Sequence, residues 1–331
     1  MISNSTSRRR FIGISAAAAG LALLPLAPHA GRAEAPALRV WRGSALGADA
    51  CIQLHHPDAE RLIGVCLAEI ERLEAVFSLY RPDSALVRLN RAGELAEPPF
   101  DLVRLLSESA GFSALTDGAF DPTVQPLWRL YAGHFATPGA DPEGPPESAV
   151  REALARVGWQ GVVVEAGRIG FARPGMALTL NGIAQGYITD RVIERLRAAG
   201  VERVLADLGE TRTLGRHPDG APWRIGLEDP RQRGQITRTL DLENRALSSS
   251  GSYGTVFEPS GRFNHLFDPA TGRCAERWPA VSVVADTATT ADALSTTFCF
   301  LSQDRMRAVL ARVGGTAYVS RGDGAQDVVN G

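Results

Sequence analysis

The segment from Val281 to Phe298, VSVVADTATTADALSTTF, brings carboxylate and hydroxyl side chains to the point where an apolar strand gives way to a helix. Asp292 and Thr296 are one helical turn apart and share a face, while Asp286 directly follows the strand. Such hard oxygen atoms suit Mg²⁺, which takes one or two carboxylates and leaves its other positions to water and substrate phosphates. Because Thr289 and Asp292 also have capping-box spacing, a metal site and a helix cap both stay open.

Five further polar clusters lie at the ends of predicted elements, where binding residues commonly occur. They are SLYRPDS (78–84), GAFDPTV (118–124), NGIAQGY (181–187), ADLGE (206–210) and NHLFDPATG (264–272). NGIAQGY opens a helix with glycines, a geometry suited to backbone contact with an anion. Of the six histidines, only His265 neighbours other reactive groups. Each cluster taken alone is more typical of turn chemistry than of a site.

The composition excludes several classes of enzyme. The chain has 331 residues, is 44% hydrophobic and 22% charged, and carries a net charge of -2, so no bulk attraction to nucleic acid is expected. All 35 basic residues are arginines, and the absence of lysine excludes P-loop kinases, PLP enzymes and class I aldolases. The four cysteines form no CxxC pair and lack zinc-ligand spacing, so free thiols are expected.

The N-terminal residues have the pattern of an export signal. Arg8 and Arg9 precede a weakly hydrophobic, alanine-rich run that glycine and proline interrupt well short of the roughly 20 residues of a membrane span. Residues 1–33 are therefore predicted to be a twin-arginine signal peptide, with cleavage near Ala33 or Ala35. No cysteine follows the run, so no membrane anchor is expected and the mature protein is predicted to reside in the periplasm.

The elements that would position these residues form an α+β pattern without a parallel βαβ rhythm. Hydrophobic periodicity predicts helices at 59–77, 100–116, 147–157, 183–199 and 291–301. It predicts strands at 39–55, 161–165, 177–180, 204–208, 223–227, 238–242, 246–249 and 281–285. A proline- and glycine-rich stretch, 136–147, is predicted to be a surface loop. We therefore expect one domain over 38–331 with an insertion loop.

Taken in order, SLYRPDS, GAFDPTV, NGIAQGY, DLG, SSSGSY, NHLFDPATG and VVADTATTADALST resemble the ApbE family of FAD:protein FMN transferases over essentially the whole mature chain. The resemblance implies a core related to the T-fold, with antiparallel sheets flanked by helices. It also implies a Mg²⁺-dependent enzyme that takes FMN from FAD, attaches it through a phosphoester to a threonine of a partner protein, and releases AMP. The expected acceptor has an FMN-binding domain and is an exported or membrane flavoprotein, such as a respiratory electron-transfer component.

The resemblance also implies roles for individual residues. The metal falls on Asp292, Thr296 and the backbone carbonyl of Gly182, with Asp286 nearby, and the family's catalytically important histidine falls on His265. Flavin-nucleotide contacts fall on Leu46, Tyr80, Ala119, Phe120, Asp121, Thr179, Gln185 and Leu266, of which Leu266 would lie beside the flavin or its phosphates. For His265, a proton acceptor is favoured over a protonated clamp on a phosphate oxygen, because the metal and backbone amides would already serve the phosphates.

The sequence departs from the family pattern at three places. Many members have lysine where Gln185 stands and aspartate where Thr179 stands, and the family's DLGG is here DLGE, ending in Glu210. These departures leave two alternatives open: a pyrophosphatase that converts FAD to FMN and AMP, or a flavin carrier without activity.

Overall fold

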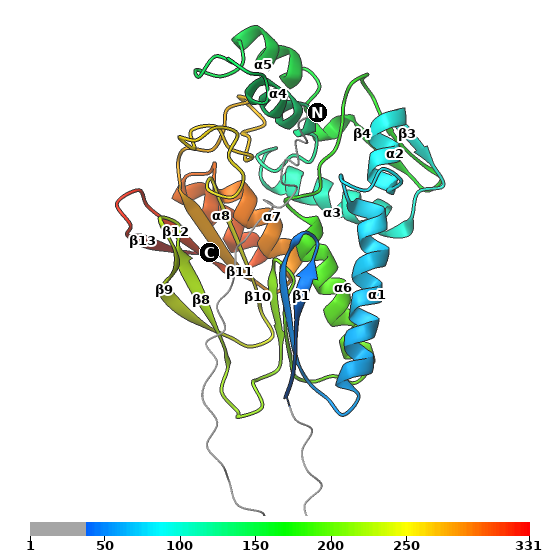
Figure 1. Ribbon diagram of the computed structural model, residues 1–331, viewed down its shortest axis with the longest axis vertical. Coiled ribbons are helices and arrows are strands. Elements are labelled where there is room, and N and C mark those ends of the chain that lie inside the picture. The colour runs from blue at the N-terminus through cyan, green and yellow to red at the C-terminus, as the bar shows by residue number, and fades with distance from the viewer. Residues whose placement is uncertain (1–37) are drawn as a thin grey trace, which may run out of the picture.

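The computed structural model describes residues 38–331, so the predicted signal peptide at 1–33 lies outside the described residues. A single antiparallel sheet runs through the molecule in the order β1-β2-β6-β7-β10-β11-β12-β13. Its strands are β1 (Leu38–Ala45), β2 (Ala48–His55), β6 (Val204–Asp207), β7 (Thr211–Leu214), β10 (Ala246–Gly251), β11 (Ala280–Ala285), β12 (Thr316–Ser320) and β13 (Gln326–Asn330). The predicted α+β class with antiparallel sheets is confirmed (Figure 1).

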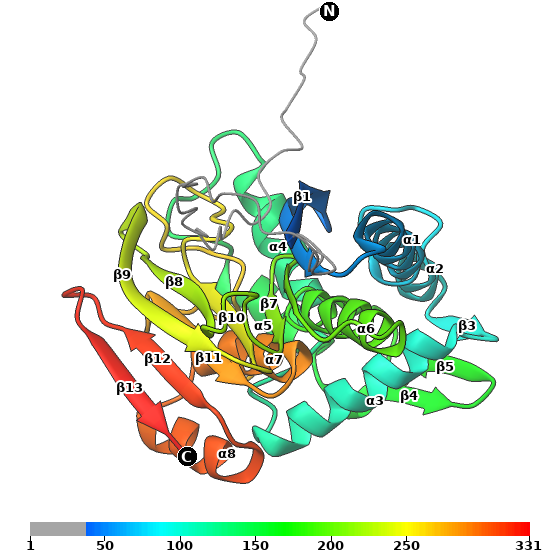
Figure 2. The same cartoon turned by 90° about the horizontal axis from the view of Figure 1, so that it is seen from below.

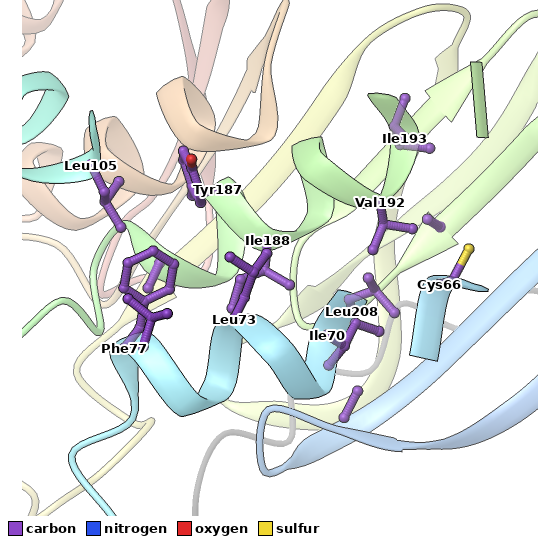
Figure 3. Packing of buried hydrophobic residues seen from close by; sticks show 14 of the residues in the cluster. Cys66, Ile70, Leu73, Phe77, Leu105, Tyr187, Ile188, Val192, Ile193 and Leu208 are labelled. Atoms are coloured by element: carbon purple, nitrogen blue, oxygen red, sulfur yellow. The ribbon is translucent and has the colours of Figure 1, made fainter. Parts of the chain in front are cut away.

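Helices cover one face of this sheet. Helix α7 (Ala288–Phe298) packs on β10 and β11, and α6 (Ala184–Ala198) lies beside it on β6 and β7 (Figure 2). Helix α1 (Ala59–Phe77) packs on the outer side of α6, where Ile70, Leu73 and Phe77 meet Tyr187 and Ile188 (Figure 3). The Phe77 and Tyr187 rings meet edge to face with centroids 5.6 Å apart, a geometry worth about 1 kcal/mol beyond burial.

A two-stranded hairpin covers part of the other face. It consists of β8 (Trp223–Asp229) and β9 (Gln232–Leu242), which lie opposite α6 and α7 (Figure 2). Side chains alternate accordingly: Leu205 joins the hairpin core, whereas Val204 and Ala206 join the core beneath the helices. The same alternation turns Ser248 of β10 toward α7, and this places polar side chains beneath that helix.

The remaining elements surround this centre. They are α2 (Ala85–Ala92), α3 (Phe100–Leu115), α4 (Gln125–Phe135), α5 (Glu147–Leu154) and α8 (Gln303–Val313), with a small sheet of β3 (Glu94–Ala96), β5 (Arg168–Phe171) and β4 (Val162–Glu165). Helices α4 and α5 pack on the loop before β11 through an apolar cluster that includes Leu127, Tyr131 and Phe267. Within residues 38–331, no helix combines the length and apolar character that a membrane crossing needs.

Two predicted strands are wrong. Residues 39–55 form the β1–β2 hairpin rather than one strand, and its two-residue loop, Leu46-Gly47, has φ values of 55° and 77°. Residues 177–180 form no strand, because the backbone N–H and carbonyl of Leu178 bond instead to the side-chain amide of Asn90 at 2.7 and 2.8 Å. The sequence patterns also miss α2, which has only 8 residues, α4, which has a proline in its first turn, and α8.

Candidate functional site

The polar clusters at 118–124, 181–187 and 264–272 converge on one cavity between the start of α6, the end of β10 and the inner face of α7. Of the thirteen candidate positions, ten line this cavity: Ala119, Phe120, Asp121, Thr179, Gly182, Gln185, His265, Leu266, Asp292 and Thr296. The other three, Leu46, Tyr80 and Asp286, lie elsewhere. The structure therefore brings together most of the residues that the sequence selected.

Asp292, Thr296 and Gly182 all line the cavity. The Asp292 side chain is buried, and its Oδ2 accepts a hydrogen bond from the backbone N–H of Gly186 at 2.9 Å. Thr296 follows one turn later, and a Cβ added to Gly182 would lie only 3.0 Å from its Oγ1. A carboxylate, a hydroxyl and a stretch of backbone are thus held close together, which is a donor set suited to Mg²⁺.

The end of the sheet determines where α7 begins. Thr287 is the N-cap, with an extended backbone, and its side chain accepts a hydrogen bond from the N–H of Thr290 at 3.1 Å. The predicted capping box of Thr289 and Asp292 is therefore wrong. The Thr289 hydroxyl donates to Asp190 of α6 at 2.6 Å, and the Asp292 carboxylate is left to face the cavity.

Asp190 fastens α7 to α6. Its two carboxylate oxygens accept hydrogen bonds from the backbone N–H groups of Ala288 and Thr289 at 2.8 and 2.9 Å, and it also pairs with Arg212 of β7. The contact between the helices is close, since a Cβ on Gly186 would lie 2.3 Å from the carbonyl oxygen of Ala288. Gly186 therefore serves helix packing, and its N–H is used by Asp292.

Asp286 does not join the cluster, and its expected place near the metal is corrected. Its side chain is 76% exposed, and its carboxylate lies 2.7 Å from the guanidinium of Arg245. Ala285, the last residue of β11, faces the core beneath α7. Asp286 follows the strand in a bend, where its pairing with Arg245 keeps the side chain exposed.

The His265 ring also lines the cavity and is held by the backbone of Thr255. Its Nδ1 lies 3.2 Å from both the N–H and the carbonyl oxygen of Thr255. Donation from Nδ1 to the carbonyl would leave Nε2 free to accept a proton. Burial lowers the pKa of His265 from 6.5 to about 4, so the ring is neutral near pH 7. A neutral ring favours the proton acceptor over the charged clamp.

A second pocket adjoins the cavity. Tyr80 lines it, and Trp128 and Asn181 line both spaces, so the two are neighbours at these residues. A long ligand could therefore place one end beside Tyr80 and the other beside His265. Leu46 lines neither pocket: it forms the tip of the β1–β2 hairpin, where its N–H donates to Glu74 of α1 at 2.8 Å.

Asp121 is used within its own loop. Its Oδ1 accepts from the N–H and hydroxyl of Thr123 at 2.8 and 2.6 Å, and its Oδ2 accepts from the N–H of Trp159 at 2.9 Å. Burial raises the pKa of this carboxyl, against the effect of these hydrogen bonds. Asp121 thus fixes the loop that presents Ala119 and Phe120 to the cavity.

Glu210 is a cavity residue to which sequence reasoning assigned no role. It is buried and lines the space beside Asp292 and Gln185. Burial raises the pKa of Glu210 well above its ordinary value, and the nearby charge of Asp292 raises it further. Burial also raises the pKa of Asp292, opposed by the N–H of Gly186. In the sequence, Glu210 is marked only by standing where the family's DLGG pattern has its last glycine.

Known proteins match this chain over most of its length. The ApbE family model matches residues 46–319. A FAD:protein FMN transferase of Haemophilus influenzae is 32% identical over 255 residues, which are 72% of this chain and 72% of that protein. The FAD:protein FMN transferase of Escherichia coli K12 is 28% identical over 294 residues, covering 86% of this chain and 82% of that protein.

Solved structures agree with the sequence matches. The apo form of the flavinyl transferase ApbE of Pseudomonas stutzeri is 31% identical, with a TM-score of 0.75 over 88% of this chain and 95% of that chain. The ApbE protein of Thermotoga maritima is 27% identical, with a TM-score of 0.78 over 88% of this chain and 96% of that chain. With the same fold, and a family match that includes every element of the cavity, the chain belongs to the ApbE family.

Proposed function

We propose that this chain is a Mg²⁺-dependent FAD:protein FMN transferase. It binds FAD across the cavity and the adjoining pocket, with the adenosine end toward Tyr80 and the flavin phosphate toward His265. It transfers FMN to a threonine hydroxyl of an acceptor protein and releases AMP. The names of its relatives in Haemophilus influenzae and Escherichia coli support the transfer reaction.

The charge of the cavity lining is the observation that carries the cation requirement. Three carboxyl groups line the cavity, those of Asp121, Glu210 and Asp292, and none of the lining side chains in the described part of the chain is an arginine. A diphosphate would therefore find no positively charged side chain among the described residues of this lining. Asp292, Thr296 and the Gly182 carbonyl would hold a divalent cation there, and the cation would supply positive charge to the phosphate oxygens.

With a cation bound, the side chains of the cavity could supply the remaining parts of the reaction. The threonine hydroxyl attacks the phosphorus that carries the flavin, a new phosphoester forms, and the bond from that phosphorus to the bridging oxygen breaks, so that AMP leaves. The neutral His265 can take the hydroxyl proton as the bond forms. The backbone of Gly182 and the hydroxyl of Thr296 lie where they can orient the diphosphate.

The test is to incubate the mature protein with FAD, Mg²⁺ and an FMN-binding domain, and to follow in-gel flavin fluorescence together with AMP. We expect a fluorescent acceptor and AMP in equal amounts. AMP without a labelled acceptor would identify a pyrophosphatase instead. FAD binding without AMP would identify a carrier.

We also propose that the protein acts in the periplasm on an exported or membrane electron-transfer flavoprotein. The proposal rests on the arginine pair at positions 8 and 9 and the alanine-rich run after it. Replacing Arg8 and Arg9 by lysine should leave the protein in the cytoplasm, because guanidinium and ammonium groups are not interchangeable in bidentate recognition. Cell fractionation measures this outcome, and export of the double variant at the wild-type level would contradict the twin-arginine route.

A further inference from the structure

Glu210 is the one cavity carboxyl that neither the fold nor the proposed reaction explains. Its side chain is 6% exposed, and its Oε2 has no hydrogen-bond partner among the described residues. A buried carboxyl oxygen without a partner costs free energy, so a fold keeps one only where something compensates. Asp121, by comparison, has hydrogen bonds to both of its oxygens.

The turn between β6 and β7 fixes the direction of the Glu210 side chain. The Glu210 carbonyl accepts a hydrogen bond from the N–H of Leu208 at 3.1 Å, which closes the turn. Gly209 has a φ of 97°, and a Cβ there would lie 2.5 Å from the side-chain nitrogen Nε2 of Gln185. The turn is thus pressed against the start of α6, and Glu210 enters the cavity beside Asp292.

No cationic side chain in the described cavity lining balances the carboxyl groups of Glu210 and Asp292. Gln185, which lies against the same turn, is neutral, and the chain has no lysine. The Ser248 hydroxyl is a hydrogen-bond partner of the Glu210 carboxyl, but a hydroxyl does not supply a charge. The proposed reaction would bring a diphosphate and a cation into this cavity. The diphosphate is negative, as a carboxylate is, so only the cation would attract the Glu210 carboxylate.

We propose that Glu210 is a second carboxylate of the cation site, acting with Asp292 to set the affinity of this protein for divalent metal. The inference rests on the proposed function, since it concerns the same cation. A second carboxylate in this position would add negative charge beside the cation, and the number of charged ligands is one of the features that set the affinity of such a site for divalent metal. A purely structural role would require only the hydrogen bond with Ser248, which an amide can also make.

The experiment is a titration of the metal-free mature protein with Mn²⁺, followed by electron paramagnetic resonance in the absence of FAD. Glu210→Gln keeps the size of the side chain and removes its charge. We expect its dissociation constant for Mn²⁺ to rise roughly 10- to 100-fold. Glu210→Ala should weaken binding to a similar extent, and it gives a second comparison if the glutamine variant does not fold.

Asp207→Asn is the matched control. Asp207 lies three residues earlier in the same turn region, and burial raises its pKa to about 7, but it lines a different pocket. Its Mn²⁺ affinity should stay within about twofold of the wild type. Thermal unfolding by circular dichroism confirms that each variant is folded, and Glu210→Gln should melt close to the wild type because the amide can keep the hydrogen bond with Ser248.

The outcomes separate this inference from the proposed function. Mn²⁺ binding that Asp292→Ala abolishes and Glu210→Gln leaves within about twofold would overturn the role of Glu210 alone. Absence of Mn²⁺ binding by the wild-type protein would overturn the cation site as a whole. Failure of both Glu210 variants to fold would show that the residue is structural.

Discussion

Replacing Asp292 by alanine should reduce FMN transfer by about a thousandfold or more, while FAD still binds measurably. The buried carboxylate faces the cavity beside Thr296. Of the two other carboxyl groups in the described cavity lining, Asp121 is hydrogen-bonded within its own loop, which leaves Glu210. Without the Asp292 carboxylate the cation would be lost, and the negative charge on the phosphate oxygens would no longer be neutralised in the transition state. The adenosine end is expected to bind at the Tyr80 pocket, away from the substitution. Steady-state transfer rates and FAD fluorescence titration measure the two effects separately.

Asp286→Ala provides the control for this experiment. Asp286 is an aspartate of the same segment, but it is 76% exposed and paired with Arg245 outside the cavity. Its transfer rate should remain within about twofold of the wild type, since an exposed ion pair contributes little to stability. If Asp292→Ala retained wild-type activity at saturating Mg²⁺, the Asp292 cluster would be only a link between two helices, through its bond to Gly186.

Replacing His265 by asparagine should lower the transfer rate by about a hundredfold or more and leave FAD affinity nearly unchanged. The asparagine can keep a hydrogen bond to the Thr255 backbone, but it cannot accept a proton from the threonine hydroxyl. His217→Asn is the matched control. His217 lies in a turn and pairs with Asp219, so its replacement should leave the transfer rate unchanged. A His265→Asn rate within a few-fold of the wild type would contradict any catalytic role for this ring.

The pH profile of the wild-type enzyme distinguishes the two roles of His265. Its pKa is about 4 in the unliganded protein, because burial disfavours the charged ring. The proton acceptor is the neutral form, so transfer should be insensitive to His265 near neutrality and should fall as pH drops toward that pKa. A charged clamp predicts the opposite trend, with binding strengthened in acid. Rates measured with a pH-stable acceptor, compared with those of His265→Asn, separate these outcomes.

Local patterns predicted the parts of the fold that local interactions decide. The helix predicted at 59–77 has those same bounds in the structure, because its apolar face repeats at helical spacing throughout. Residues 281–285 and 204–208 lie in strands within one residue of the prediction. The pairing order of the sheet could not be predicted in this way, because β1-β2 joins β6 across about 150 residues, and such pairing is decided by burial of both faces.

In the candidate site, too, some residues lie where they were predicted and others do not. Asp292, Thr296 and Gly182 come together as the resemblance implied, but Asp286 and Leu46 do not. Asp286 follows β11 in a bend that leaves it exposed, and the hairpin loop places Leu46 against Glu74 of α1. Both outcomes depend on where a strand ends, which sequence patterns locate least well.

Glu210 could not be recognised from the sequence because its significance lies in what surrounds it. A glutamate in a turn is ordinarily solvated. Only the folded chain shows that the turn is pressed against Gln185 and that the carboxyl is buried beside Asp292. The absence of lysine, visible from composition, becomes meaningful when no cationic side chain is found in the described cavity lining.

We propose that this protein moves FMN from FAD to a threonine of another protein with the help of a divalent cation. The most direct measurement is the intact mass of a purified FMN-binding domain after incubation with the protein and FAD, with and without Mg²⁺. We predict that the domain gains the mass of one phosphoester-linked FMN only when Mg²⁺ is present, and that substitution of its acceptor threonine by valine abolishes the gain. An unchanged mass in the presence of Mg²⁺, with FAD either intact or converted to free FMN and AMP, would contradict the account.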